Sequence, residues 1–104
     1  MRSPVHIACL QTQPKPNFEA ALAEVLDLAT VAVGQGAQVL FLPEYCGGLR
    51  TKGGMCAPPA LPEALHPVLT GLRGFAQAHD VWISVGSVAV PGSAGKVINR
   101  SLLL

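Results

Sequence analysis

Charged residues are scarce in this sequence. Asp, Glu, Lys and Arg make up only 12% of its 104 residues, whereas 50% are apolar, and ordinary globular domains carry roughly 25% charged residues. A chain of this length forms at most one small domain, which has a high ratio of surface to volume and needs charge to stay soluble. We therefore expect some of its outer faces to be covered, either by a partner chain or by a further part of the same chain.

The sequence also lacks a basic patch and a long hydrophobic run. Its net charge of +1 comes from dispersed side chains, a pattern that predicts neither nucleic acid nor an anionic membrane surface as a partner. No apolar run approaches the ~18 residues of a membrane span. Pro4 and His6 interrupt the first residues, so we expect no export signal, which needs an unbroken apolar segment.

Cysteines are few and do not occur in pairs. Cys9, Cys46 and Cys56 are odd in number, and no CxxC pair is present. This usage argues against a disulfide framework and against a structural zinc site, and it fits a reducing compartment. We expect a cytoplasmic protein without a bound metal or cofactor.

The apolar pattern of the first half predicts a strand, a helix and a second strand. Residues 5–10 are nearly all apolar, as in a strand of a sheet that is covered on both faces. Residues 18–33 carry apolar side chains at steps of three and four, which predicts a helix with Asn17 as its N-cap. Residues 39–42 form the next predicted strand. Together these elements predict a βαβ unit with parallel strands.

The second half predicts a loop, a helix and two antiparallel strands. Gly and Pro are so frequent in residues 47–62 that no regular element fits. Such a loop is either one wall of a cleft or a mobile surface excursion. Pro67 opens a second helix. Residues 81–85 form a third strand, and Gly86 and Ser87 after it indicate a bulge or a close approach of the backbone. Residues 97–104 pair with that strand in antiparallel fashion.

Glu44 is the most informative single position. It follows an apolar strand and Pro43, which cannot donate to a sheet ladder and therefore ends the strand. In open α/β sheets, ligands bind just outside the carboxyl ends of the parallel strands. A carboxylate at this point is either a solvated residue at a strand end or a functional group at the mouth of a cleft.

Three short motifs, taken in order with these elements, make the chain resemble a known family. They are Leu42-Pro43-Glu44, Val85-Gly86-Ser87 and Asn99-Arg100-Ser101. Over essentially all of its length the chain is similar to the N-terminal part of the nitrilase, or carbon–nitrogen hydrolase, superfamily. The resemblance implies an incomplete hydrolase domain at residues 1–104 with no second domain. It also implies an α/β fold that is the N-terminal portion of a four-layer α-β-β-α sandwich. The sequence stops inside an apolar run, which likewise leads us to expect a domain that continues.

Members of this family cleave amides or nitriles with a Glu, a Lys and a Cys. The Cys attacks the carbon of the C–N bond, the Glu acts as general base, and the Lys stabilises the tetrahedral intermediate. The resemblance places only the base on this chain, at Glu44, and Tyr45 and Cys46 in the substrate pocket. Lys52 and Lys96 do not occupy the position of the family's Lys. We therefore expect a small amide or nitrile substrate, a homo-oligomer at full length, and no activity from these residues alone.

A second hypothesis stays open, in which the chain is a self-sufficient α/β module. It would bind a ligand or partner at the Glu44 strand end and use Cys46 as a reactive thiol. Because the family's nucleophile comes from a later strand, we interpret Cys46 instead as a small pocket or core residue. The reactivity of this thiol distinguishes the two hypotheses.

Overall fold

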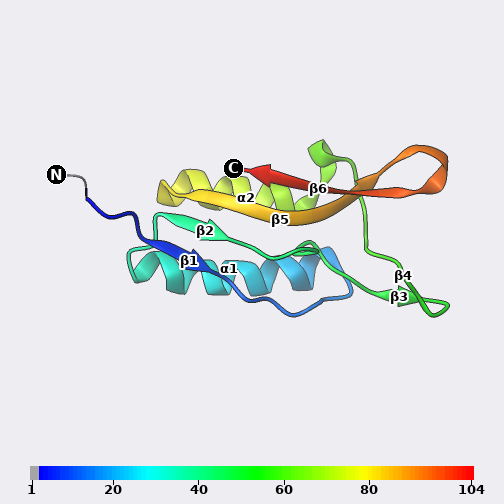
Figure 1. Ribbon diagram of the computed structural model, residues 1–104, viewed down its shortest axis with the longest axis horizontal. Coiled ribbons are helices and arrows are strands. Elements are labelled where there is room, and N and C mark those ends of the chain that lie inside the picture. Colours follow the sequence, from blue (N-terminus) through cyan, green and yellow to red (C-terminus); the bar gives the residue numbers. More distant parts are fainter. Residues whose placement is uncertain (1–2) are drawn as a thin grey trace.

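Strands and helices alternate along most of the chain. The computed structural model describes residues 3–104. In chain order its elements are β1 (Ile7–Cys9), α1 (Phe18–Gly34), β2 (Val39–Phe41), β3 (Thr51–Lys52), β4 (Met55–Cys56), the 3-10 turn η1 (Glu63–Leu65), α2 (Pro67–His79), β5 (Trp82–Pro91), the 3-10 turn η2 (Ser93–Gly95) and β6 (Val97–Leu103). This mixed architecture confirms the predicted α/β class (Figure 1).

The main sheet has the strand order β1-β2-β5-β6. β1 is parallel to β2 and β2 is parallel to β5, whereas β6 is antiparallel to β5. The predicted βαβ unit is confirmed, with α1 as the crossover that a parallel pair requires. As a result, the carboxyl ends of β1, β2 and β5 lie toward the same end of the sheet, the end at which the β3–β4 hairpin projects (Figure 1).

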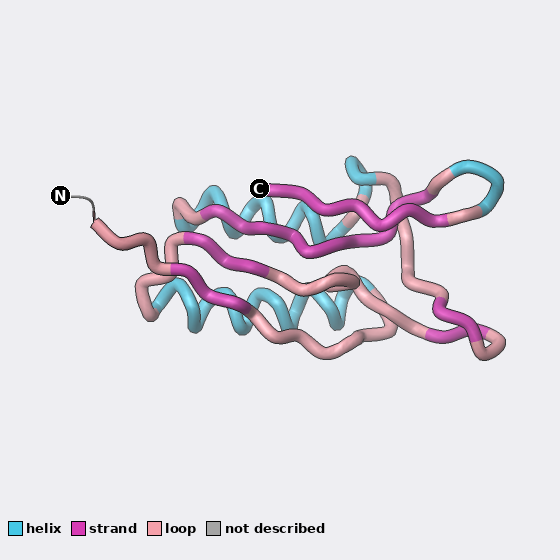
Figure 2. The backbone as a smooth tube through the Cα atoms, in the orientation of Figure 1, coloured by secondary structure: helices cyan, strands magenta, loops and turns pink. Residues whose placement is uncertain are grey.

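Two details of the second half differ from the prediction. The stretch 47–62 is not free of regular structure, because β3 and β4 pair in antiparallel fashion around Gly53 and Gly54, and Figure 2 shows this hairpin apart from the main sheet. β5 does not end at residue 85 but runs on to Pro91, with a register shift between Val85 and Val88. The predicted bulge at residues 86–87 is therefore confirmed, but it bends the strand and does not end it.

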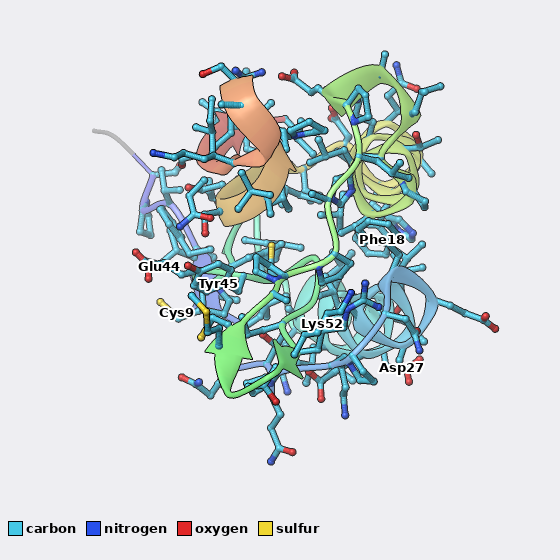
Figure 3. The ribbon with its side chains drawn as sticks, turned by 90° about the vertical axis from the view of Figure 1, so that its right-hand side faces the viewer. Cys9, Phe18, Asp27, Glu44, Tyr45 and Lys52 are labelled. Atoms are coloured by element: carbon cyan, nitrogen blue, oxygen red, sulfur yellow. The ribbon has the colours of Figure 1, made fainter. Side chains whose placement is uncertain are left out.

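Both helices lie on one side of the sheet (Figure 3). α1 begins where the side chain of Asn17 accepts a hydrogen bond from the Ala20 N–H at 2.8 Å, and α2 begins at Pro67, whose fixed φ suits a first helical turn. Each helix buries one apolar stripe against the sheet, made of Ala21, Val25, Ala29 and Ala32 on α1 and Val68, Leu69, Leu72 and Ala76 on α2. No helix within residues 3–104 is long and apolar enough to cross a membrane.

The two faces of the sheet differ in burial. Leu40 lies opposite Ile83 on the face toward the helices, and these side chains are 0% and 1% exposed. Because successive side chains of a strand point to opposite faces, the neighbouring residues lie on the other face, which residues 3–104 leave without a covering layer. Large apolar side chains are exposed there, namely Ile7, Phe41, Trp82 and Leu103. The sequence predicted a sheet that is covered on both faces. Within residues 3–104, the helices cover one of these faces.

Candidate functional site

Glu44 lies in the turn that follows β2. The Leu42 N–H still donates to the Ser84 carbonyl at 2.9 Å, but Pro43 has no N–H and ends the ladder as predicted. The Glu44 side chain is exposed, and in Figure 3 it lies with Cys9 and Tyr45 on the side of the sheet away from the helices. Within residues 3–104 its carboxylate makes no hydrogen bond and no ion pair. It is therefore free to accept a hydrogen bond from a bound group.

Glu44 is one of the residues that line a cavity of about 390 Å³. The cavity is lined by Gln11, Thr12, Pro14, Pro43, Glu44, Tyr45 and Leu49. Gln11 and Thr12 follow β1, and Glu44 follows β2, so the cavity sits at the carboxyl ends of two neighbouring parallel strands, where ligands of such sheets bind. The structure thus brings together Glu44 and Tyr45 of the predicted site. Gln11 and Thr12 were not predicted as site residues, although the parallel pairing of β1 with β2 places the residues after β1 beside those after β2.

The turn around Glu44 has a strained backbone that β5 holds in place. Tyr45 adopts φ 54°, in the left-handed region that costs non-glycine residues roughly 1–2 kcal/mol. Its N–H donates to the Ser87 hydroxyl oxygen at 3.0 Å, and the Cys46 N–H donates to the Ser87 carbonyl at 3.1 Å. The bulge of β5 therefore accepts two successive N–H groups of the turn.

Gly86 explains why the turn can approach β5 so closely. A Cβ atom at this position would lie 2.3 Å from the carbonyl oxygen of Leu42 and 2.3 Å from the carbonyl carbon of Pro43. These obstacles are backbone atoms, so they cannot rotate away as a side chain could. Only glycine fits between the end of β2 and β5.

Strand β6 supports the same turn from the far side of β5. The Asn99 side-chain amide donates to the Tyr45 hydroxyl oxygen at 3.1 Å, and the Ser101 hydroxyl donates to the Val85 carbonyl at 2.8 Å. Arg100 points elsewhere and pairs with Glu63 at 2.9 Å. The three sequence motifs, far apart along the chain, therefore meet around one turn, and this meeting gives a physical reason for their joint presence.

Cys46 is part of the core and does not line the cavity. Its side chain is 3% exposed, and its thiol donates to the Ser87 carbonyl at 3.5 Å. Burial raises the pKa of the Cys46 thiol to about 11, since a thiolate loses its hydration there. A thiol of this kind is a poor nucleophile near neutral pH. Of the two interpretations left open for Cys46, the structure agrees with the core residue, and it does not favour the reactive thiol.

Beneath the turn lies a fully buried histidine. His66 is 0% exposed, and neither of its ring nitrogens has a hydrogen-bond partner within the described residues. Its ring contacts that of Phe18, with the centroids 4.6 Å apart, and a Cβ added to Gly47 would lie 3.0 Å from it. Burial lowers the pKa of His66, so the neutral ring acts as packing between the two helix starts and the turn.

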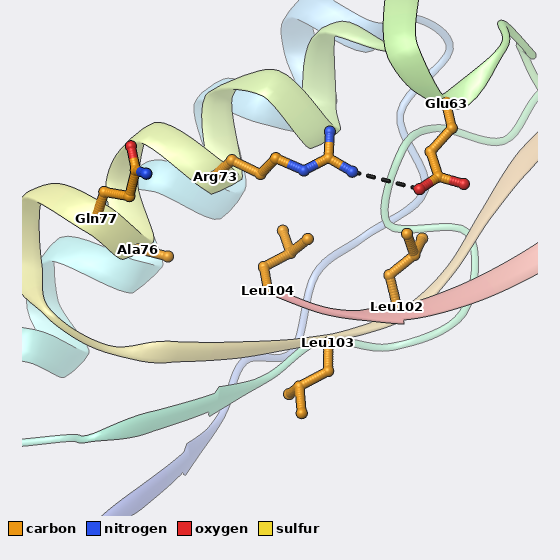
Figure 4. A pocket seen from close by; sticks show the side chains of 7 residues that line it. All are labelled: Glu63, Arg73, Ala76, Gln77, Leu102, Leu103 and Leu104. Carbon is orange, nitrogen blue, oxygen red and sulfur yellow. Dashed lines mark hydrogen bonds and ion pairs between the residues drawn. The ribbon is translucent and has the colours of Figure 1, made fainter.

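A second hollow lies between α2 and β6, away from Glu44 (Figure 4). Its volume is also about 390 Å³, and its lining is Glu63, Arg73, Ala76, Gln77, Leu102, Leu103 and Leu104. The Glu63 carboxylate faces Arg73 at 3.4 Å as well as Arg100, so its charge is already compensated. Partly exposed ion pairs of this kind contribute little stability. The hollow therefore offers apolar surface and no free reactive group.

The remaining reactive side chains do not assemble into a metal centre. Within residues 3–104 no three His, Cys, Asp or Glu side chains come together where they could hold a metal ion. Neither Lys52 nor Lys96 lines the Glu44 cavity. In this part of the chain the candidate site thus consists of one free carboxylate, the hydroxyl and amide groups beside it, and an apolar rim.

Comparison with protein families identifies the class to which this arrangement belongs. The sequence profile of the carbon–nitrogen hydrolase family matches residues 6–104. The chain therefore belongs to the carbon–nitrogen hydrolase family, as its motifs indicated. Comparison with curated proteins gives no match.

Proposed function

We propose that Glu44 is the general base of an enzyme that hydrolyses the C–N bond of a small amide or nitrile. The observation that carries the proposal is the position of Glu44, which lines a cavity at the carboxyl ends of β1 and β2 and whose carboxylate has no partner among the described residues. Family membership gives the reaction class. The cavity supports this location for the meeting of substrate and base.

The chemistry requires two further groups. A thiol becomes a strong nucleophile when a base within hydrogen-bond reach removes its proton. The tetrahedral intermediate then carries negative charge, which a nearby cation stabilises. Glu44 supplies only the base that removes the proton. The nucleophile and the cation are still required, because the cavity lining contains neither Cys nor Lys. We propose that the nucleophilic Cys and the Lys come from residues outside this sequence, and that residues 1–104 are inactive by themselves.

The exposed face of the sheet supports a larger architecture. Ile7, Phe41 and Trp82 lie on this face and are 59%, 41% and 59% exposed. Contiguous apolar surface on a sheet normally marks a face that packs against another layer. We propose that a second sheet covers it in a four-layer α-β-β-α sandwich, with Glu44 at the edge of the junction. We further propose that the protein is a homo-oligomer. We also propose a cytoplasmic location, which suits the three free cysteines.

Hydrolysis assays test this function. The product of the source gene is offered a panel of small primary amides and nitriles, and release of ammonia is measured beside the same assay of residues 1–104 alone. We expect turnover by the gene product and none by the shorter chain. Turnover by residues 1–104 that disappears in Glu44→Gln would contradict the claim that the other groups lie elsewhere. No turnover by the gene product on any amide or nitrile would contradict the reaction class.

A further inference from the structure

The position from which the Glu44 side chain projects is set by the backbone on either side of it. The carboxylate is exposed, and within residues 3–104 it makes no hydrogen bond that could hold it. A general base has to lie within hydrogen-bond reach of the proton it removes. Whatever fixes Pro43 and Tyr45 therefore also fixes the point from which the base reaches a substrate.

Pro43 and Tyr45 are fixed in different ways. Pro43 is held sterically, because its carbonyl group packs against Gly86. Tyr45 is held in the left-handed conformation, at φ 54°, which an L-residue leaves unless surrounding contacts over-determine it. Its N–H has one acceptor among the described residues, the side-chain oxygen of Ser87 at 3.0 Å.

We propose that Ser87 is the positioning residue of the Glu44 base. Its hydroxyl oxygen accepts the Tyr45 N–H and keeps the strained turn in the conformation that places Glu44 in the cavity lining. The bulge of β5 makes this possible, because it turns both the side chain and the carbonyl of Ser87 toward the turn. The catalytic meaning of this role rests on the proposed function, whereas the structural link between Ser87 and Glu44 does not.

The burial of Ser87 supports a specific role for its hydroxyl. The residue is only 5% exposed, and a buried polar group without a partner is costly. An alanine at this position would keep the carbonyl that accepts the Cys46 N–H and would remove only the acceptor of the Tyr45 N–H. Loss of the hydroxyl can therefore be separated from loss of the bulge.

Residue-resolved amide hydrogen exchange on the product of the source gene tests the proposal. In Ser87→Ala we expect exchange of the Tyr45 amide to accelerate about tenfold, the effect of losing one hydrogen bond of ordinary strength. The Cys46 amide should keep its rate, since its acceptor is a backbone carbonyl. Carbon NMR of the Glu44 carboxyl group should show a shifted resonance in the same variant. Ser84→Ala is the matched control, because the Ser84 hydroxyl makes no hydrogen bond within the described residues.

The outcomes decide between a local and a general effect. Unchanged exchange at Tyr45, or an unchanged Glu44 resonance, would overturn the proposal. Equal acceleration at Tyr45 and Cys46 would also overturn it, because Ser87 would then only stabilise the bulge. None of these results depends on turnover. A failure of the proposed hydrolase activity would therefore leave the link between Ser87 and Glu44 intact, and the reverse also holds.

Discussion

Replacing Gly86 with alanine measures how closely the Glu44 turn depends on β5. The added Cβ would lie 2.3 Å from the carbonyl oxygen of Leu42 and from the carbonyl carbon and oxygen of Pro43. Since all three obstacles are backbone atoms, either β5 or the segment leading to Glu44 has to move. The hydrogen bond from the Leu42 N–H to the Ser84 carbonyl, at 2.9 Å, opposes that movement.

The expected loss of stability follows from this geometry. Adding a methyl group to a packed interior usually costs about 1–3 kcal/mol, and the rigid obstacle places Gly86→Ala at the upper end, about 3 kcal/mol in the free energy of unfolding. For a domain of this size such a loss lowers the melting temperature by roughly 12 °C or more. Urea unfolding followed by circular dichroism gives the free energy directly.

Gly74→Ala is the matched control for this measurement. Gly74 lies in the exposed middle of α2, and an added Cβ there meets nothing within 4 Å. Alanine should therefore stabilise the helix by about 0.5–1 kcal/mol. A Gly86→Ala variant whose free energy of unfolding matched that of the wild type would refute the close contact between the end of β2 and β5.

Two further predictions concern the buried titratable groups. The pKa of the Cys46 thiol is raised to about 11. Cys46 should therefore react with a thiol reagent at pH 8 at least about a hundredfold more slowly than the exposed Cys9 and Cys56. Mass spectrometry of each site measures the rates, and equal rates would contradict the burial of Cys46. The pKa of His66 is lowered in the folded chain, so the unfolded chain binds the proton more readily. The neutral His66 ring therefore contributes stability above about pH 6.5, and this stability is lost as the pH falls. Urea unfolding between pH 7 and 5 should show a smaller acid-induced loss in His66→Leu than in the wild type, and identical losses would contradict this assignment.

The main elements could be predicted because each carries a strong local signal. The long apolar stripe and Asn17 fixed α1, and Pro67 fixed the start of α2. The β3–β4 hairpin was missed because strands of two residues are too short to show any alternation. The extension of β5 was missed because a glycine such as Gly86 usually marks the end of a strand. Here Gly86 lies inside the strand and permits close contact with the end of β2.

The site could be predicted in part for similar reasons. Glu44 followed from the end of an apolar strand in a parallel sheet, a feature of local order and topology. The sequence shows that Cys46 is close to Glu44 along the chain, but it does not show which way the side chain points. That direction depends on the left-handed Tyr45 and on the hydrogen bonds that the Tyr45 and Cys46 N–H groups donate to Ser87. The contacts between the three motifs form only when β5 and β6 fold against the turn, so a linear pattern could not predict them.

The central claim, that Glu44 is the base of a carbon–nitrogen hydrolase, is tested most directly by one substitution. Ammonia release from an amide or nitrile substrate is measured for the product of the source gene, for Glu44→Gln and for Glu19→Gln, an exposed glutamate on α1 that is not part of the cavity lining. We predict that Glu44→Gln lowers the rate at least about a hundredfold, as loss of a general base does, and that Glu19→Gln leaves it unchanged. A Glu44→Gln enzyme as active as the wild type would contradict the account.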